Sequence, residues 1–381
     1  MSKLTIVFAI SLALLIYGGA NLYVGHRLYR GLVLIFSRIN KWVFACVYGV
    51  IAFSYLLEFL PLPGAINELV TTFSSYWLGI FVYLLLWFAV IDVVVFIGKL
   101  CKLIPSPVPK VVRLCSWGLA IFCTIAFVGY GIYNATQIKE VQYKISTKDS
   151  VDSPKMKIVV ISDLHLGAIQ SENRLEEIVE KINAMKPDLI AIPGDIFNDD
   201  FDAVKNPKRV SELFKQLEAP YGVYATLGNH DGGKTFHQMV KLLKDSNIML
   251  LKDEYVIIDD RFALAGRLDS SPIRGYGGLK RKDMQDSLEK IDPKLPLIVL
   301  DHNPIHLEEY SSNVDLILSG HTHKGQIFPG SLITNQIYVV DYGHYQKNAN
   351  SPHVIVTSGV GTWGMPMRVG TNNEIVEIIL D

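Results

Sequence analysis

The sequence predicts an α/β domain preceded by a four-helix transmembrane region, and two observations support this. Four long apolar stretches fill the first third of the 381-residue chain and give it a positive mean hydropathy of +0.27. From residue 134 onward, short β-branched runs alternate with amphipathic helical patterns, as is typical of α/β layers. We therefore expect a transmembrane region over residues 1–133 and one soluble domain over residues 134–381.

The four apolar stretches are each about long enough to cross a ~30 Å hydrocarbon core as a helix. They lack the charged face that an amphipathic helix of a soluble domain would show. A signal peptide is an alternative for the first stretch, but its basic region is weak and three more stretches follow, which favours a retained anchor. The predicted spans are residues 4–24, 42–60, 76–97 and 116–133.

Asp92 lies inside the third predicted span. A carboxylate at membrane depth is a candidate for a functional role. Because it is isolated in the sequence, it does not indicate a transport pathway. Pairing with a residue on a neighbouring helix is the alternative.

The loops between the predicted spans differ in charge, and this difference predicts an orientation. The second loop carries no Lys or Arg, whereas the first and third are basic. Basic loops stay cytoplasmic, so the soluble domain is predicted to be extracytoplasmic in a multi-pass protein of the cell membrane. The basic residues are Arg27, Arg30, Arg38 and Lys41 in the first loop, and Lys99, Lys102, Lys110 and Arg113 in the third.

The soluble domain carries seven more acidic than basic side chains, so its bulk charge does not favour a nucleic-acid partner. All four Cys lie in or beside the predicted spans, so no thiolate is available in the domain. Two helices are predicted around Leu175 and Val210 from apolar residues at helical spacing. Strands are predicted near 141–145 and at 157–161, 189–192, 223–226, 255–258, 262–265, 297–300, 316–318, 337–340, 354–357 and 374–379.

Five short polar motifs follow five of these predicted strands. Loops at the carboxyl ends of strands build the active sites of α/β sheets, so we expect the motifs to meet. A lone Asp or His is usually an ordinary polar residue, but the ordered set contains five of the ten His of the chain. It supplies enough oxygen and imidazole donors for two divalent cations. The motifs are Asp163-Leu164-His165, Gly194-Asp195, Gly228-Asn229-His230-Asp231, His302, and Gly320-His321-Thr322-His323.

This set of motifs, together with Gly325-Gln326, resembles the calcineurin-like metallophosphoesterase superfamily and, within it, the membrane-attached bacterial phosphoesterases. The resemblance covers residues 134–381. It implies a two-sheet α/β sandwich flanked by helices, and a binuclear metal centre that hydrolyses phosphate esters with the help of two cations.

The resemblance also implies roles for individual residues. Asp163, His165 and His323 would hold one metal ion. Asn229, His302 and His321 would hold the other, and Asp195 would bridge both. Mn, Zn and Fe are the expected metals, because imidazole and carboxylate ligands suit them. His230 would contact substrate and protonate the leaving oxygen as general acid.

Two positions depart from the family pattern. Relatives often carry an Asp that orients the catalytic His where this chain has Asn198, so Asp199 or Asp231 must substitute if the partner is kept. Relatives also often have Gly at the position of Lys324, which we consider as a phosphate ligand or as a solvated lysine. Arg368, in a Gly-rich loop near the C-terminus, is a second candidate for binding substrate phosphate, with a plain turn as the alternative.

The function predicted from the sequence is a membrane-anchored two-metal phosphoesterase, a hydrolase acting on phosphomonoesters or phosphodiesters. A site near a bilayer suggests a lipid-linked or envelope-derived substrate, so the expected partners are a phosphate ester and the membrane. No protein partner can be inferred. The alternatives are a nucleotide or protein phosphatase, and a non-catalytic domain of this family that acts as a scaffold or sensor. The intact ligand set argues against the scaffold.

Overall fold

The structure is a computed structural model that describes residues 3–60, 62–146, 155–169 and 172–381. It divides into two compact units, Met1–Tyr130 and Gly131–Asp381. All strands of the described chain lie in the second unit. Each unit is considered by itself.

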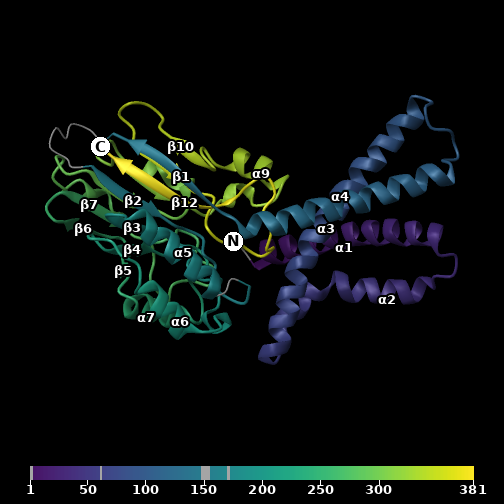
Figure 1. The fold of residues 1–381 in the computed structure, drawn as a ribbon, viewed down its shortest axis with the longest axis horizontal. Helices are drawn as coiled ribbons and strands as arrows, with labels where there is room; N and C mark the ends of the chain where they lie inside the picture. The colour runs from purple at the N-terminus through teal and green to yellow at the C-terminus, as the bar shows by residue number, and fades with distance from the viewer. Residues whose placement is uncertain (1–2, 61, 147–154, 170–171) are drawn as a thin grey trace. The chain divides into compact units, whose positions relative to one another are not determined.

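The first unit consists of long helices. Figure 1 shows the α1–α2 and α3–α4 connections at the same end of this unit. A small apolar core, which includes Val24, Phe81 and Phe88, holds α1 against α3. The helices are α1 (Lys3–Ile35), α2 (Lys41–Ala52), the 3₁₀ helix η1 (Ser54–Phe59), α3 (Gly64–Leu100) and α4 (Lys110–Thr136).

Of the four predicted membrane spans, the structure supports two. Within the described residues, two helices are long and apolar enough to cross a membrane, α3 and α4, and they contain the third and fourth predicted spans. The second predicted span is broken at Phe53, where α2 ends and η1 begins. With its 12 residues, α2 covers only about 18 Å at 1.5 Å per residue. Hydropathy alone does not reveal such a break, because both pieces are apolar.

The second unit is built on two six-stranded sheets. The strand order is β1-β12-β2-β3-β4-β5 in the first sheet and β10-β11-β9-β8-β7-β6 in the second. Strands β2 to β5 run parallel in the first sheet, and β7, β8, β9 and β11 run parallel in the second. The strands are β1 (Ile138–Ile145), β2 (Met156–Val160), β3 (Leu189–Pro193), β4 (Val223–Thr226), β5 (Met249–Leu250), β6 (Glu254–Ile258), β7 (Phe262–Gly266), β8 (Leu297–Leu300), β9 (Leu316–Ser319), β10 (Gly343–Tyr345), β11 (His353–Val356) and β12 (Asn373–Leu380).

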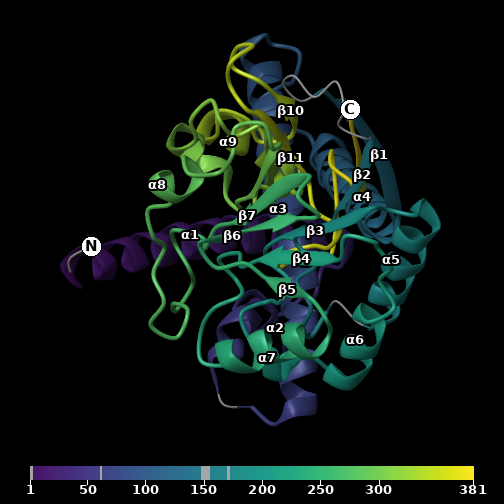
Figure 2. The ribbon, with the colours of Figure 1, turned by 90° about the vertical axis from the view of Figure 1, so that its left-hand side faces the viewer.

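Apolar side chains fill the space between the two sheets and cover their outer faces. Ile158 and Leu189 of the first sheet share a buried cluster with Leu300 and Leu318 of the second. The outer face of the first sheet is covered by α5 (Glu172–Met185), α6 (Pro207–Phe214) and α7 (Phe236–Asp245), as Figure 2 shows. The short helix α8 (Gln285–Leu288) packs on the outer face of the second sheet. The predicted two-sheet α/β sandwich with outer helices is therefore confirmed.

One predicted strand is absent from the structure. Residues 337–340 do not form a strand, because Ile337 is the last residue of the helix α9 (Gly330–Ile337). The apolar run that predicted the strand is largely exposed, and Val339 is 72% accessible. A hydrophobic run predicts a strand only if the run is buried, and this one is not.

Candidate metal centre

The predicted metal ligands all lie in loops that follow strands. Asp163 follows β2, Asp195 follows β3 and Asn229 follows β4 in the first sheet. His302 follows β8, while His321 and His323 follow β9, in the second sheet. Because these strands are parallel within each sheet, their carboxyl ends share one edge. The structure brings all seven side chains together at that edge.

The first group consists of Asp163, His165 and His323, whose ligand atoms lie within 4.8 Å of one another. His323 Nε2 is 3.1 Å from His165 Nε2 and 3.3 Å from Asp163 Oδ1. All three residues are buried. This is the set that the sequence assigns to one metal ion.

The second group consists of Asp195, His302 and His321, with the same mutual spacing. His302 Nε2 lies 3.1 Å from Asp195 Oδ2 and 3.3 Å from His321 Nδ1. Asn229 Oδ1 is 2.8 Å from His321 Nδ1, which places the amide beside this group. The members are those that the sequence assigns to the other metal ion.

Asp195 lies between the two groups. Its Oδ2 is 3.1 Å from His302 Nε2 and 3.8 Å from His165 Nε2. Its Oδ1 accepts a hydrogen bond of 2.8 Å from the backbone N–H of His230. The carboxylate thus stands where a ligand shared by two cations would stand.

Backbone groups orient two of the predicted ligands, His302 and Asp163. His302 Nδ1 lies 2.8 Å from the carbonyl oxygen of Pro193, so donation from Nδ1 would leave Nε2 free to face the centre. The Asp163 carboxylate accepts from the backbone N–H of His321, at 3.1 and 3.2 Å to its two oxygens. Such outer contacts fix the direction of each donor atom.

The protonation of the histidines suits metal binding. Burial disfavours the charged imidazole and lowers the pKa of His165 to about 3 and that of His321 to about 3. Burial likewise lowers the pKa of His323 well below its usual value. Neutral imidazole is the form that binds a metal ion. The buried Nδ1 of His165 has no hydrogen-bond partner among the described residues.

Asp195 and His302 each favour the charged form of the other. At His302, burial disfavours the charged form, but the Asp195 carboxylate outweighs it and raises the pKa well above the usual value. At Asp195, burial opposes ionisation, but His302 outweighs it and holds the pKa below its usual range. A cation bound here would take the place of the His302 proton, as metal ions do on binding to imidazole. The donor set therefore fits divalent metal ions.

The ligand loops adopt backbone conformations that L-residues rarely use. Five ligands have positive φ angles between 48° and 71°, in the left-handed region. Backbone strain of this kind clusters at functional sites. The five are Asp163, His165, Asp195, His321 and His323.

Two glycines let the ligand loops approach one another closely. A Cβ at Gly228 would lie 2.2 Å from Asp195 Oδ1, and a Cβ at Gly320 would lie 2.2 Å from Asp163 Oδ2. No side chain fits at either position. The glycines in front of the motifs therefore have a steric role in addition to their role in turns.

His230 lies beside the ligands with a carboxylate behind it. Its Nδ1 is 2.9 Å from Asp199 Oδ1, and its ring centroid is 5.1 Å from that of His165. Asp231, the other candidate partner, instead accepts from the backbone N–H groups of Phe197 and Gly228, both at 2.8 Å. Of the two alternatives left open by the sequence, the structure therefore places Asp199 at His230.

The two residues predicted to bind substrate phosphate, Lys324 and Arg368, contact other groups of the protein. Lys324 places its ammonium group 4.0 Å from the centre of the Tyr342 ring, so its predicted role in phosphate binding has no geometric support. Arg368 is fully buried and donates to Ser358 O at 2.7 Å and to Asn373 Oδ1 at 2.8 Å.

The contacts of Arg368 give no support to its predicted role in binding substrate. Its Nη1 donates to the His323 carbonyl at 3.1 Å, and its Nη2 lies 3.1 Å from His323 Nδ1. The guanidinium therefore positions a ligand loop from behind and does not face a substrate. A sequence cannot distinguish a buried arginine of this kind from one that lines a site.

An apolar surface beside the centre was not expected from the sequence. Tyr338 packs against His321 with ring centroids 6.1 Å apart, and Trp363 packs against His230 at 5.7 Å. Four apolar residues in α9 and just after it expose between 58% and 72% of their surface. We call Leu332, Ile333, Ile337 and Val339 the α9 apolar surface.

Comparisons with known proteins place these residues in one family pattern. A family model described as calcineurin-like phosphoesterase matches residues 156–325, which include all seven predicted ligands. An uncharacterized metallophosphoesterase of Aquifex aeolicus is 30% identical over 261 residues, which cover 68% of this chain and 98% of the relative.

Two further relatives match over nearly the whole chain. An uncharacterized metallophosphoesterase of Campylobacter jejuni is 28% identical over 381 residues, covering 96% of each chain. A Danio rerio protein described as a transmembrane protein with metallophosphoesterase domain is 27% identical over 377 residues, covering 94% of this chain and 81% of its own. The similarity therefore extends into the helical unit.

Proposed function

The chain belongs to the calcineurin-like phosphoesterase family, and we propose that it is a membrane-anchored two-metal phosphoesterase that hydrolyses phosphomonoesters or phosphodiesters. The observation that carries the proposal is the pair of three-residue ligand groups that meet at Asp195. A site with one group would suffice for a structural metal, whereas two adjacent groups with an acid–base histidine suit hydrolysis.

The residues divide into ligands and a proton donor. Asp163, His165 and His323 would hold one ion, Asn229, His302 and His321 the other, and Asp195 both. Bound there, two ions of Mn, Zn or Fe would activate water and offset the charge that develops on the phosphate oxygens.

His230 acts on the leaving group in this proposal. Its Nδ1 faces Asp199, so Nε2 is the atom available to the substrate. Burial disfavours the protonated imidazole, but the hydrogen bond to Asp199 and the Asp195 charge outweigh it and raise the pKa of His230. The histidine therefore holds a proton that it can give to the departing oxygen.

Metal-dependent turnover by the full-length protein tests the proposal. The purified protein, stripped with a chelator, is incubated with a chromogenic phosphomonoester or phosphodiester before and after addition of Mn, Zn or Fe. Hydrolysis that depends on the added ion is the expected result. Metal binding without hydrolysis of either compound, or of nucleotide and phosphopeptide substrates, would favour the scaffold or sensor instead.

We further propose that the substrate is a lipid phosphate. The α9 apolar surface supports this, because α9 packs on the loop that carries His323 and exposes large apolar side chains beside the centre. Exposed patches of this kind mark interaction sites. The two membrane-length helices found among the described residues make a bilayer the available apolar partner.

Polar substitutions in the α9 apolar surface should affect lipid substrates alone. With Leu332→Gln and Ile333→Gln combined, we expect kcat/KM for phosphatidic acid in mixed micelles to fall about tenfold or more. Burial of two such side chains is worth about 1.5–3 kcal/mol each, and 1.4 kcal/mol is a factor of ten. Turnover of the soluble chromogenic ester should change less than about twofold.

The matched control replaces two exposed apolar residues outside the α9 apolar surface, Met249→Gln in β5 and Ile257→Gln in β6. This variant should keep wild-type rates on both substrates. Equal losses on lipid and soluble substrates in the α9 variant would indicate damage to the centre and would contradict the lipid proposal. An unchanged rate on the lipid would contradict it as well.

We also propose that α3 and α4 cross the membrane as a hairpin, with the catalytic unit outside the cytoplasm. The basic residues Lys99, Lys102, Lys110 and Arg113 flank the connection between them, and basic connections stay cytoplasmic. The proposal needs only these two spans. The test uses a protein that carries a tag at its C-terminus. Protease added to intact spheroplasts should digest the tagged second unit without lysis. Protection of the tag until lysis would indicate the opposite orientation. The substrates would then be those of the cytoplasm and the inner leaflet.

A further inference from the structure

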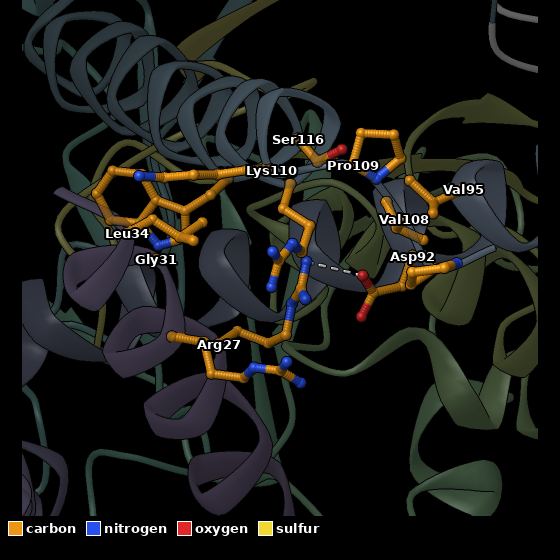
Figure 3. A pocket seen from close by; sticks show the side chains of 13 residues that line it. Arg27, Gly31, Leu34, Asp92, Val95, Val108, Pro109, Lys110 and Ser116 are labelled. Atoms are coloured by element: carbon orange, nitrogen blue, oxygen red, sulfur yellow. Dashed lines mark ion pairs between the residues drawn. The ribbon is translucent and has the colours of Figure 1, made fainter. Parts of the chain in front are cut away.

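A charged cavity lies within the first unit, at its basic end. The cavity has a volume of about 620 Å³ and is bounded by α1, α3, α4 and the connection before α4. Its size is within the range of small-molecule sites, about 300–1,000 Å³. Figure 3 shows the side chains that line it. None of them belongs to the metal centre.

The cavity carries an excess of positive charge. Arg27, Arg30, Lys110 and Arg113 line it, against a single carboxylate, Asp92. Asp92 Oδ1 pairs with Arg27 Nη2 at 2.8 Å, the ion pair drawn as a dashed line in Figure 3. In the described part of the chain, no ion pair engages the other three cations. They remain available to an anion.

Arg27 and Asp92, which pair with each other on one side of the cavity, also contact neighbouring aromatic residues. Tyr23 donates a hydrogen bond of 2.7 Å to Asp92 Oδ2, and the Arg27 guanidinium lies 5.5 Å from the centre of the Phe88 ring. Asp92 is thereby assigned a structural partner on a neighbouring helix. Because both of its oxygens are engaged, Asp92 does not neutralise the remaining cations.

A close helix contact sets the back of the cavity. Gly31 of α1 lies against the Trp117 indole of α4, where a Cβ would come within 1.9 Å of the ring. The indole therefore occupies the space that a side chain at residue 31 would need. This contact holds α1 and α4 at the spacing that brings Arg30 and Arg113 to one cavity.

We infer that this cavity binds the phosphate group of an anionic lipid headgroup. Arginine guanidinium groups recognise phosphate oxygens through paired hydrogen bonds, and Lys110 adds a point charge. Basic pockets between membrane helices near a membrane surface bind anionic lipid headgroups. The cavity adjoins the basic connection of α3 and α4, the segment expected at that surface. The inference rests on the proposed membrane anchoring and not on the phosphoesterase activity.

Lipid binding to the full-length protein tests the inference. In detergent and with a chelator present, so that the metal centre does not compete, native mass spectrometry measures binding of phosphatidylglycerol, of phosphatidylcholine with the same chains, and of inorganic phosphate. We expect phosphatidylglycerol to bind at least about tenfold more tightly than phosphatidylcholine. With Arg30→Gln and Arg113→Gln combined, that preference should disappear, since each basic residue contributes about a factor of five and the two together about 25-fold.

A control of equal charge separates the cavity from general attraction. Arg38→Gln and Lys102→Gln combined remove two cations that do not line the cavity, and should change the preference less than about threefold. Equal losses in both variants would overturn the inference, as would equal binding of the two lipids by the wild type. Binding of inorganic phosphate as tight as that of phosphatidylglycerol would overturn the lipid assignment. Unchanged unfolding midpoints for both variants exclude misfolding as the cause.

Discussion

Asp195→Asn should remove most activity and much of the bound metal together. The carboxylate lies 3.1 Å from His302 and 3.8 Å from His165, so it belongs to both ligand groups. An amide offers one oxygen where the carboxylate offers two, and its nitrogen does not bind a cation. The loss should exceed the ~10–100-fold that changes in outer contacts of a metal site typically cost. Metal content by mass spectrometry and turnover of the chromogenic ester are measured on the same sample.

Asp188→Asn is the matched control for this substitution. Asp188 stands just before β3 and Asp195 just after it, so the two replacements test opposite ends of one strand. Asp188 Oδ2 accepts from the backbone N–H of Lys157 at 2.7 Å, a contact that an amide oxygen can keep. Metal content and turnover should stay near the wild-type values. If Asp195→Asn also keeps them, the bridging assignment is wrong.

His230→Ala should keep both metal ions and lose rate by about 10²–10⁴, the usual size of a general acid–base contribution. The His230 ring is hydrogen-bonded to Asp199. Among the described residues, it forms no hydrogen bond with a predicted ligand. The loss should shrink for esters with good leaving groups, because these depart without a proton. Turnover is compared across a series of aryl esters, with metal content measured alongside.

Two companion variants sharpen this prediction. Asp199→Asn should cause a smaller rate loss of the same leaving-group dependence, because the amide can hold the ring but not stabilise its charge. His237→Ala removes an exposed histidine of α7 and should change nothing. A loss of metal from the His230 variant would make His230 a ligand and require a different division of roles.

The sequence predicts much of this centre because its residues follow a simple rule. Asp163, Asp195 and Asn229 each come a few residues after a β-branched run that ends in a loop, and so do His302 and His321. Parallel strands bring such loops to one edge, so the grouping of the ligands follows from chain order. Their assignment as ligands of two metal ions stays a prediction, supported by the geometry.

Other features depend on packing that a sequence does not display. Whether Asp199 or Asp231 faces His230 is decided by which carboxylate the backbone N–H groups of Phe197 and Gly228 capture. Arg368 looks like an available cation in the sequence but is enclosed by the carbonyl groups of its own loop. The break at Phe53 and the exposure of Val339 are likewise invisible to hydropathy, which records composition and not burial.

Strand β12 determines the order in which the second unit can be completed during synthesis. It lies between β1 and β2, and all eight of its residues pair with β1, from Ile138 opposite Asn373 to Ile145 opposite Leu380. Until Leu380 leaves the ribosome, β1 has no partner strand and the sheet that carries Asp163 and Asp195 stays open. The helices of the first unit emerge long before then. Closure of the sheet is therefore one of the last steps of folding, and a chain that stops before β12 would leave β1 without its partner strand.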